Sequence, residues 1–110
     1  MFSNSGIQTA HDLPATVLAE ECYRCMFHGC YNLTKAPILP ATVLVTNCYY
    51  YMFNMCTKLD SVTAMFVTTP GDNYTYNWLR GVKSSGTFIK NINATWDVRG
   101  NNGVPSGWTT

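Results

Sequence analysis

Apolar residues recur at a spacing of four in two short stretches of the chain, residues 22–30 and 48–56. The first stretch has Cys22, Met26 and Cys30, with Tyr23 and Phe27 beside them. The second repeats the same residue types as Cys48, Tyr49, Met52, Phe53 and Cys56. A spacing of four places side chains on one face of a helix. The pattern therefore predicts a short helix in each stretch, with these residues facing the core.

The remaining positions of the two predicted helices face outward. In the first helix they are Arg24, Cys25, His28 and Gly29, and in the second they are Tyr50, Tyr51, Asn54 and Met55. Residues 33–36 and 59–62 follow the helices, alternate in polarity and predict single strands of a parallel sheet. Residues 15–18 and 41–45 are compatible with either a second extended edge or a tight turn of helix.

The pattern changes after Ala64. Residues 65–67 predict a strand, residues 69–72 a turn, and residues 73–82 a helix with Asp72 as N-cap. Tyr74, Trp78 and Leu79 face inward in that helix. Residues 87–90 predict another strand, and the last twenty residues, which contain Trp96 and Trp108 among glycines, predict an irregular cap.

The two stretches belong to a longer duplication. Residues 13–38 and 39–64 align without a gap and share twelve identities, which are LPATVL, Cys-Tyr, Met-Phe, Cys and Leu. A fixed period of this size indicates stacked repeats. We therefore expect an α/β fold, a short solenoid of strand–turn–short helix layers with an irregular C-terminal cap. Its single domain, 1–110, divides into a partial repeat (1–12), two repeats (13–38 and 39–64), and a divergent repeat with the cap (65–110).

Composition excludes several classes of function. The 110 residues include 7 Lys and Arg and 6 Asp and Glu, for a net charge of +1, and no run of like charge. We therefore expect no nucleic-acid partner. No stretch of 18 apolar residues predicts membrane insertion, and residues 1–10 do not form a signal peptide. Only 12% of the residues are charged, as in many secreted or surface-displayed proteins.

The five cysteines do not predict a disulfide framework, because the number is odd and four of them are set by the repeat. Equivalent residues of layers about 8–10 Å apart are too distant for a bond that needs Cα atoms within about 7 Å. We expect buried thiols instead. Cys22 and Cys25 have the CxxC spacing of redox proteins, but only one of the two is a repeat position. No set of ligands at metal spacing and no nucleophile–base pair is present, so we expect no metal, no cofactor and no enzyme activity.

The order L-P-A-T-x-L, then C-Y-x-x-M-F-x-x-C, then Leu resembles the BspA-like, or Treponema-type, leucine-rich repeats. The segment GTFIKNINATWDVRGNNGVPSGWTT is similar to the C-terminal cap of such arrays. The resemblance implies a cell-surface or extracellular bacterial protein that mediates adhesion by binding a protein or a glycan. Similar repeats in phage-borne proteins leave an attachment protein as an alternative, and a structural cap or spacer of a longer array is another.

Candidate binding residues are those that differ between the two copies, because matched positions serve the fold. They are Arg24, His28, Tyr50, Tyr51 and Asn54, with Tyr50 and Tyr51 as the centre, since Tyr and Arg are favoured at binding surfaces. Drift at solvated positions is the competing interpretation. The incomplete first repeat also predicts possible self-association through residues 1–12.

Overall fold

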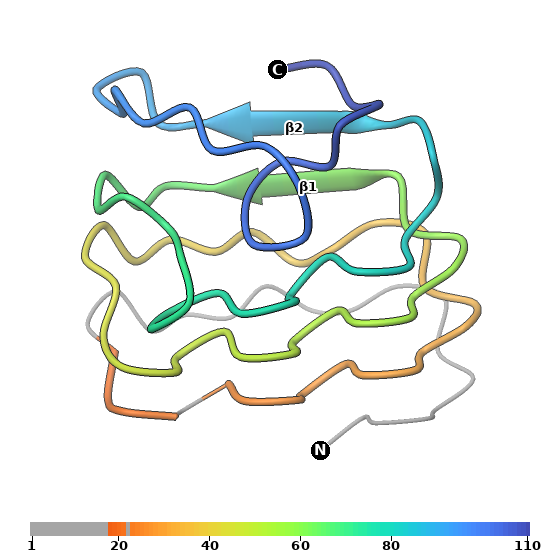
Figure 1. Cartoon of the computed structure of the whole chain (residues 1–110), viewed down its shortest axis with the longest axis horizontal. Helices are drawn as coiled ribbons and strands as arrows, with labels where there is room; N and C mark the ends of the chain where they lie inside the picture. The colour runs from red at the N-terminus through yellow and green to blue at the C-terminus, as the bar shows by residue number, and fades with distance from the viewer. Residues whose placement is uncertain (1–17, 22) are drawn as a thin grey trace.

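Consecutive turns occupy the stretches that the sequence predicts to be helices (Figure 1). The computed structural model of the chain describes residues 18–21 and 23–110. This described part contains no helix and only two short strands, β1 (Ser61–Ala64) and β2 (Thr87–Lys90). The predicted α/β solenoid of strand–turn–helix layers is therefore wrong, as are the helices predicted around Met26, around Met52 and over residues 73–82.

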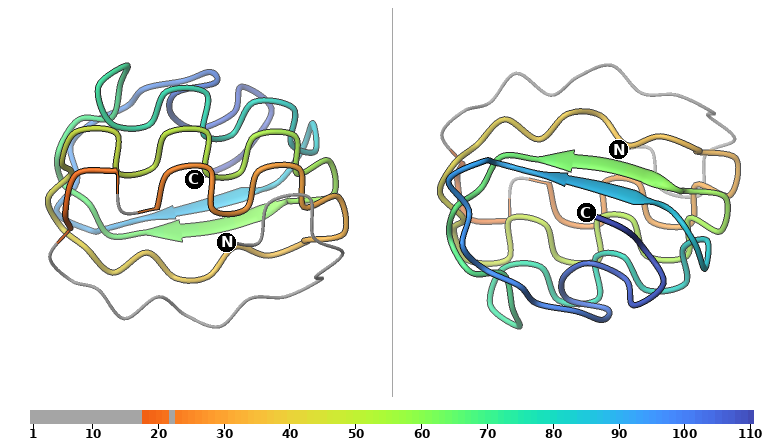
Figure 2. Two further views of the ribbon diagram at one scale, coloured as in Figure 1. Left: turned by 90° about the horizontal axis from the view of Figure 1, so that it is seen from below. Right: turned by 90° about the horizontal axis from the view of Figure 1, so that it is seen from above.

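Three rows of turns replace those helices, and they lie side by side (Figure 2): row 1 (residues 23–30), row 2 (46–56) and row 3 (72–82). Within a row, alternate backbone N–H groups donate to the carbonyl three residues earlier, as His28 does to Cys25 at 3.2 Å. The N–H groups between them donate to the next row, as Cys25 does to Tyr50 at 2.8 Å and Tyr51 to Tyr76 at 3.0 Å. A helix keeps all such bonds within one segment, whereas half of these cross between rows.

A left-handed residue recurs every fourth position along the rows. In row 2 the φ angles of Asn47, Tyr51 and Met55 are 54°, 53° and 63°, and in row 3 those of Asn77 and Gly81 are 50° and 77°. Such φ values interrupt a right-handed helix. The period of four that predicted a helix is therefore the period of these turns.

The parallel sheet lies across the core from the rows (Figures 1 and 2). β1 and β2 pair in parallel, with Ser61 opposite Thr87, and single bridges extend the pairing from Lys35 to Ser61 and from Thr87 to Thr109. The predicted strand 87–90 is confirmed. The strand predicted at 59–62 begins two residues later, the one at 33–36 is reduced to the bridge at Lys35, and residues 65–67 form no strand.

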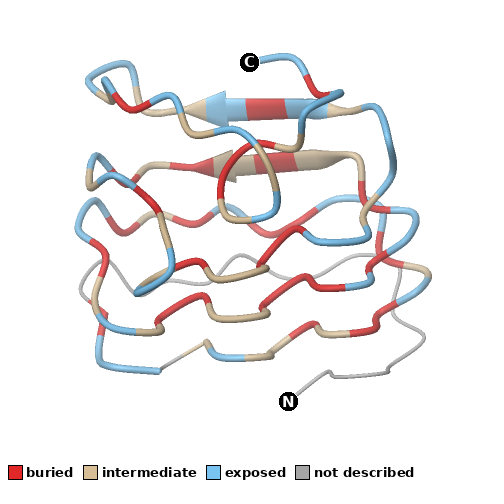
Figure 3. Ribbon diagram, in the orientation of Figure 1, coloured by how far each residue is buried: buried red, intermediate tan, exposed pale blue. Residues whose placement is uncertain are grey.

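Aromatic side chains fill the space between the rows and the sheet. Phe27 and Phe53 stack at 5.5 Å between ring centroids, and Trp78 contacts both Phe53 at 6.3 Å and Phe88 of β2 at 5.9 Å. Figure 3 shows that buried residues alternate with less buried ones along the strands and recur along the rows. The inward residues predicted in the second repeat are confirmed as buried: Cys48, Tyr49, Met52, Phe53 and Cys56.

The C-terminal segment covers the outer edge of row 3. The Asn77 N–H, which corresponds to the Tyr51 N–H of row 2, donates to Asn102 Oδ1 at 2.7 Å. Trp78 Nε1 donates to the Gly103 carbonyl at 3.1 Å. Asn102 Nδ2 also donates to Asp72 Oδ1 at 2.7 Å. An asparagine side chain thus takes the place of the carbonyl that a further row would supply.

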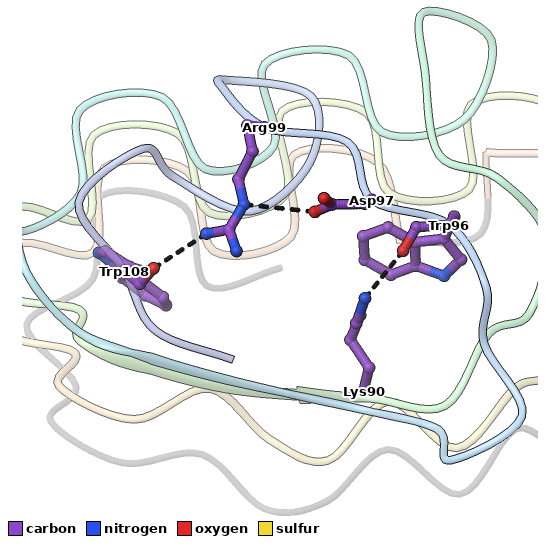
Figure 4. Close-up of polar contacts among 5 residues, drawn as sticks. All are labelled: Lys90, Trp96, Asp97, Arg99 and Trp108. Atoms are coloured by element: carbon purple, nitrogen blue, oxygen red, sulfur yellow. Dashed lines mark hydrogen bonds and ion pairs between the residues drawn. The ribbon is translucent and has the colours of Figure 1, made fainter.

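The same segment closes the sheet, and both predicted cap tryptophans are buried. Trp108 Nε1 donates to the Lys83 carbonyl at 2.8 Å. Figure 4 shows Arg99 donating to the Trp108 carbonyl at 2.9 Å while pairing with Asp97 at 3.4 Å. It also shows Lys90 donating to the carbonyl of Trp96, over whose ring its ammonium lies. Lys90 therefore fastens the cap to β2, while Arg99 joins two parts of the cap to each other.

Candidate functional site

Residues 26 positions apart lie next to each other in adjacent rows, and one such column carries two of the predicted outward residues, Arg24 and Tyr50, together with Tyr76 of row 3. The Arg24 guanidinium lies over the Tyr50 ring, 4.8 Å from its centroid. Tyr50 in turn stacks on Tyr76 at 5.7 Å, with 29° between the ring planes. One residue of each row therefore contributes to a continuous cation–aromatic stack.

Tyr51 joins this column to His28. Its ring centroid lies 4.4 Å from that of Tyr50, 5.7 Å from that of Tyr76 and 6.3 Å from that of His28. The structure thus brings four of the five predicted site residues together and adds a fifth from row 3. We call this cluster the tyrosine surface: Arg24, His28, Tyr50, Tyr51 and Tyr76.

The tyrosine surface is partly open to solvent. Arg24 is exposed, and the other four members are half-buried. Among the described residues, none is hydrogen-bonded to the phenol hydroxyls of Tyr50, Tyr51 or Tyr76. The ring bodies are fixed by their mutual contacts, while the polar ends are free to meet water or a ligand.

Asn54 does not belong to the exposed surface, and its predicted outward position is wrong. It is only 4% exposed, because it occupies the column between His28 of row 1 and Arg80 of row 3. Its Nδ2 lies 3.1 Å from His28 Nδ1. Its Oδ1 is buried and has no hydrogen-bond partner among the described residues. Asn54 therefore contacts His28 from a buried position and is not accessible to a partner.

Sequence reasoning missed Tyr76 and Arg80, which both lie in row 3. Each stands 26 residues after a candidate, Tyr76 after Tyr50 and Arg80 after Asn54. The identities end at Ala64, but the spatial period continues, since Ser61 pairs with Thr87. Extending the spacing of 26 beyond the region of identity would have identified both residues.

Three of the described cysteines are thiols packed in the core. Cys30, Cys48 and Cys56 are buried, which confirms the buried thiols predicted for the repeat positions that the structure describes, and the Cys25 thiol is half-buried. Cys56 Sγ donates to the Phe27 carbonyl at 3.0 Å. Burial raises the pKa of the Cys56 thiol to about 12; a hydrogen bond with the Cys30 backbone opposes this effect, and the charge of the nearby Cys30 thiolate adds to it. Cys22, the other half of the CxxC pair, lies outside the described residues.

A cavity of about 270 Å³ lies away from the tyrosine surface, between residues 79–84 and 100–107. None of the predicted site residues lines it. In the described part of the chain, no three His, Cys, Asp or Glu side chains are grouped so that they could hold a metal ion. The described residues also include no helix long and apolar enough to cross a membrane.

Comparisons of the chain with protein-family models, with curated proteins and with solved structures returned no match. The interpretation of the site therefore depends on its residues and their geometry.

Proposed function

We propose that this chain is a non-catalytic binding module, displayed at the cell surface or outside the cell, which recognises a protein or a glycan through the tyrosine surface. One observation carries the proposal. Arg24, Tyr50 and Tyr76, which are 26 residues apart, form a single stack with Tyr51 against its side. Residues that serve only as solvated turns have no need of such an arrangement.

The physical properties of the cluster suit recognition. Tyrosine and arginine are the residue types that most often carry binding energy. Tyr50 contacts Tyr51 and Tyr76, and Arg24 covers its other side, so these side chains are already ordered before binding. An ordered surface loses less conformational entropy on association. The resemblance of the repeat to BspA-like surface proteins and the low content of charged residues support display outside the cell.

The test compares the chain with its Tyr50→Ala/Tyr51→Ala variant against immobilised matrix proteins and printed glycans. We expect at least a tenfold weaker Kd for the variant, since two hot-spot side chains together contribute more than about 1.4 kcal/mol. Tyr31→Ala is the matched control, because Tyr31 is 53% exposed and lies outside the cluster. Equal binding by the double variant and the wild type would rule out the tyrosine surface.

A structural cap or spacer is the second candidate, and the C-terminal segment favours it. Asn102 covers row 3, and Thr109 pairs with β2, so both edges on this side are closed. Under this alternative the chain ends a longer array and depends on it for stability. A monomeric and cooperatively melting chain 1–110 contradicts that dependence, while aggregation supports it. The segment predicted to mediate self-association, 1–12, lies outside the described residues.

A further inference from the structure

We infer that the ligand of the tyrosine surface is an acidic glycan, a hydroxyl-rich polysaccharide that carries carboxylate groups. This inference rests on the proposed function and specifies its ligand. It follows from which parts of the tyrosines remain accessible, from how the backbone groups of the rows are used, and from the charges that flank the stack.

The stack covers ring faces but leaves the phenol hydroxyls of Tyr50 and Tyr51 without a hydrogen bond to a described residue. Tyr50 lies between the Arg24 guanidinium at 4.8 Å and the Tyr76 ring at 5.7 Å, so both of its faces are occupied. Its phenol hydroxyl, like that of Tyr51, is hydrogen-bonded to no described residue. A phenol hydroxyl both donates and accepts hydrogen bonds. The surface therefore offers several adaptable hydrogen-bonding groups and little apolar area, which complements a ligand whose own surface is mostly hydroxyl groups.

A peptide ligand fits the same surface poorly. Peptides that bind by adding a strand need unpaired backbone groups, but the N–H groups of Asn47, Tyr49, Tyr51, Phe53 and Met55 all donate to row 3. Peptides that bind through anchor side chains need a pocket near the centre of the interface. The cavity of about 270 Å³ between residues 79–84 and 100–107 does not meet this need, because no member of the tyrosine surface lines it.

Arg24, whose guanidinium lies over the Tyr50 ring, supplies the preference for acid groups, and Arg80 of row 3 is a second exposed cation. Arg24 belongs to row 1 and Arg80 to row 3, both are exposed, and neither forms a salt bridge with a described residue. The Arg24 guanidinium carbon lies 4.8 Å from the Tyr50 ring centroid, and the guanidinium group carries five N–H donors. Glu20 and Glu21 precede Arg24, and the Glu21 carboxylate accepts from Asn47 Nδ2 at 3.4 Å. Arginine recognises carboxylate through two parallel hydrogen bonds.

The test measures binding of the whole chain to four soluble polymers by isothermal titration calorimetry. Hyaluronate and polygalacturonate carry both hydroxyl and carboxylate groups, dextran carries hydroxyl groups alone, and poly-glutamate carries carboxylates on a peptide. We expect the two acidic polysaccharides to bind at least tenfold more tightly than dextran and poly-glutamate. Their binding should also weaken as salt is raised, because ion pairs at an exposed surface are screened.

Two conservative substitutions locate the contact. Tyr50→Phe keeps the stack and removes only the hydroxyl, and we expect it to weaken polysaccharide binding about two- to tenfold, the effect of one hydrogen bond. Arg24→Gln should remove most of the preference for acidic polysaccharides over dextran. Tyr31→Phe and Lys35→Gln are the controls, since both residues are exposed and lie outside the tyrosine surface, and they should bind as the wild type does.

Each result decides between the inference and its alternatives. Equal binding of dextran and hyaluronate overturns the requirement for acid groups, and equal binding of poly-glutamate overturns the requirement for a glycan. If no polysaccharide binds but a protein binds and loses affinity in Tyr50→Ala/Tyr51→Ala, the ligand class is wrong and the proposed function stands. If neither kind of ligand depends on these tyrosines, the proposed function fails together with the inference.

Discussion

Replacing Gly81 by alanine tests the turn geometry directly. The turn geometry predicts that the substitution destabilises the protein, whereas a helix predicts that it stabilises it. In a helix an exposed glycine costs roughly 0.5–1 kcal/mol relative to alanine, so Gly81→Ala would stabilise the protein. In row 3 the φ of Gly81 is 77°, and an added Cβ would lie 2.5 Å from the Met55 sulfur. The structure therefore predicts destabilisation.

The expected loss is about 2 kcal/mol of unfolding free energy. A left-handed conformation costs an alanine roughly 1–2 kcal/mol, and forcing a side chain into an occupied space adds about 1–3 kcal/mol. The smaller entropy of the unfolded alanine variant returns about 0.4–1 kcal/mol. The steric part resides in Met55, whose flexible side chain can move. Placing Gly81→Ala in a Met55→Ala background should therefore reduce the loss to about 1 kcal/mol.

Urea denaturation followed by tryptophan fluorescence measures these differences, since Trp78, Trp96 and Trp108 are all buried. Gly71→Ala is the control, because an added Cβ there meets nothing within 4 Å and the φ of Gly71 is not left-handed. Its stability should equal or slightly exceed that of the wild type. A Gly81→Ala variant that is as stable as Gly71→Ala would refute the turn geometry and support a helix over residues 73–82.

Two further predictions concern the cap and the core. Asn102→Ala should lower the unfolding free energy by about 1–3 kcal/mol, because the Asn77 N–H loses its acceptor. Asn102→Asp keeps that acceptor but places its carboxylate against that of Asp72, so adding Asp72→Asn should restore the stability of the Asn102→Asp variant. In this double-mutant cycle, additive changes in unfolding free energy would contradict the contact between residues 72 and 102. The folded-state pKa of Cys56, about 12, lies above its ordinary value of 9.0. The unfolded thiol therefore loses its proton first as pH rises, and this residue should lower stability by up to about 1.4 kcal/mol per pH unit above pH 9. Under reducing conditions the stability difference between wild type and Cys56→Ala should shrink from pH 8 to pH 10, and a constant difference would refute the shift.

The sequence predicted the buried residues better than the elements that carry them. Met52, Phe53 and Cys56 are buried as predicted, because a turn row and a helix both return a side chain to the same face after four residues. The period alone does not distinguish the two. A distinguishing signal lies at Asn47, Asn77 and Gly81, where residue types that tolerate positive φ stand in the left-handed positions.

The sequence also predicted part of the candidate site. Positions that differ between the copies identified Arg24, Tyr50 and Tyr51, because variation marks residues released from core packing. The same rule failed for Asn54, which is enclosed by its neighbours in adjacent rows. Burial by an adjacent row is a tertiary effect that comparison of two copies does not reveal.

The hydrogen bonds between the rows give this side of the molecule a direction. Backbone N–H groups of row 1 donate to carbonyls of row 2, and those of row 2 donate to carbonyls of row 3. Examples are the bonds from Phe27 to Met52 and from Phe53 to Trp78. The bond dipoles therefore align along the stacking axis and add, as peptide dipoles do along a helix. The positive end lies at row 3, where Asn102 and Asp72 supply oxygen atoms. Two copies placed edge to edge about a two-fold axis would oppose donor to donor, so extension along this axis is possible only head to tail.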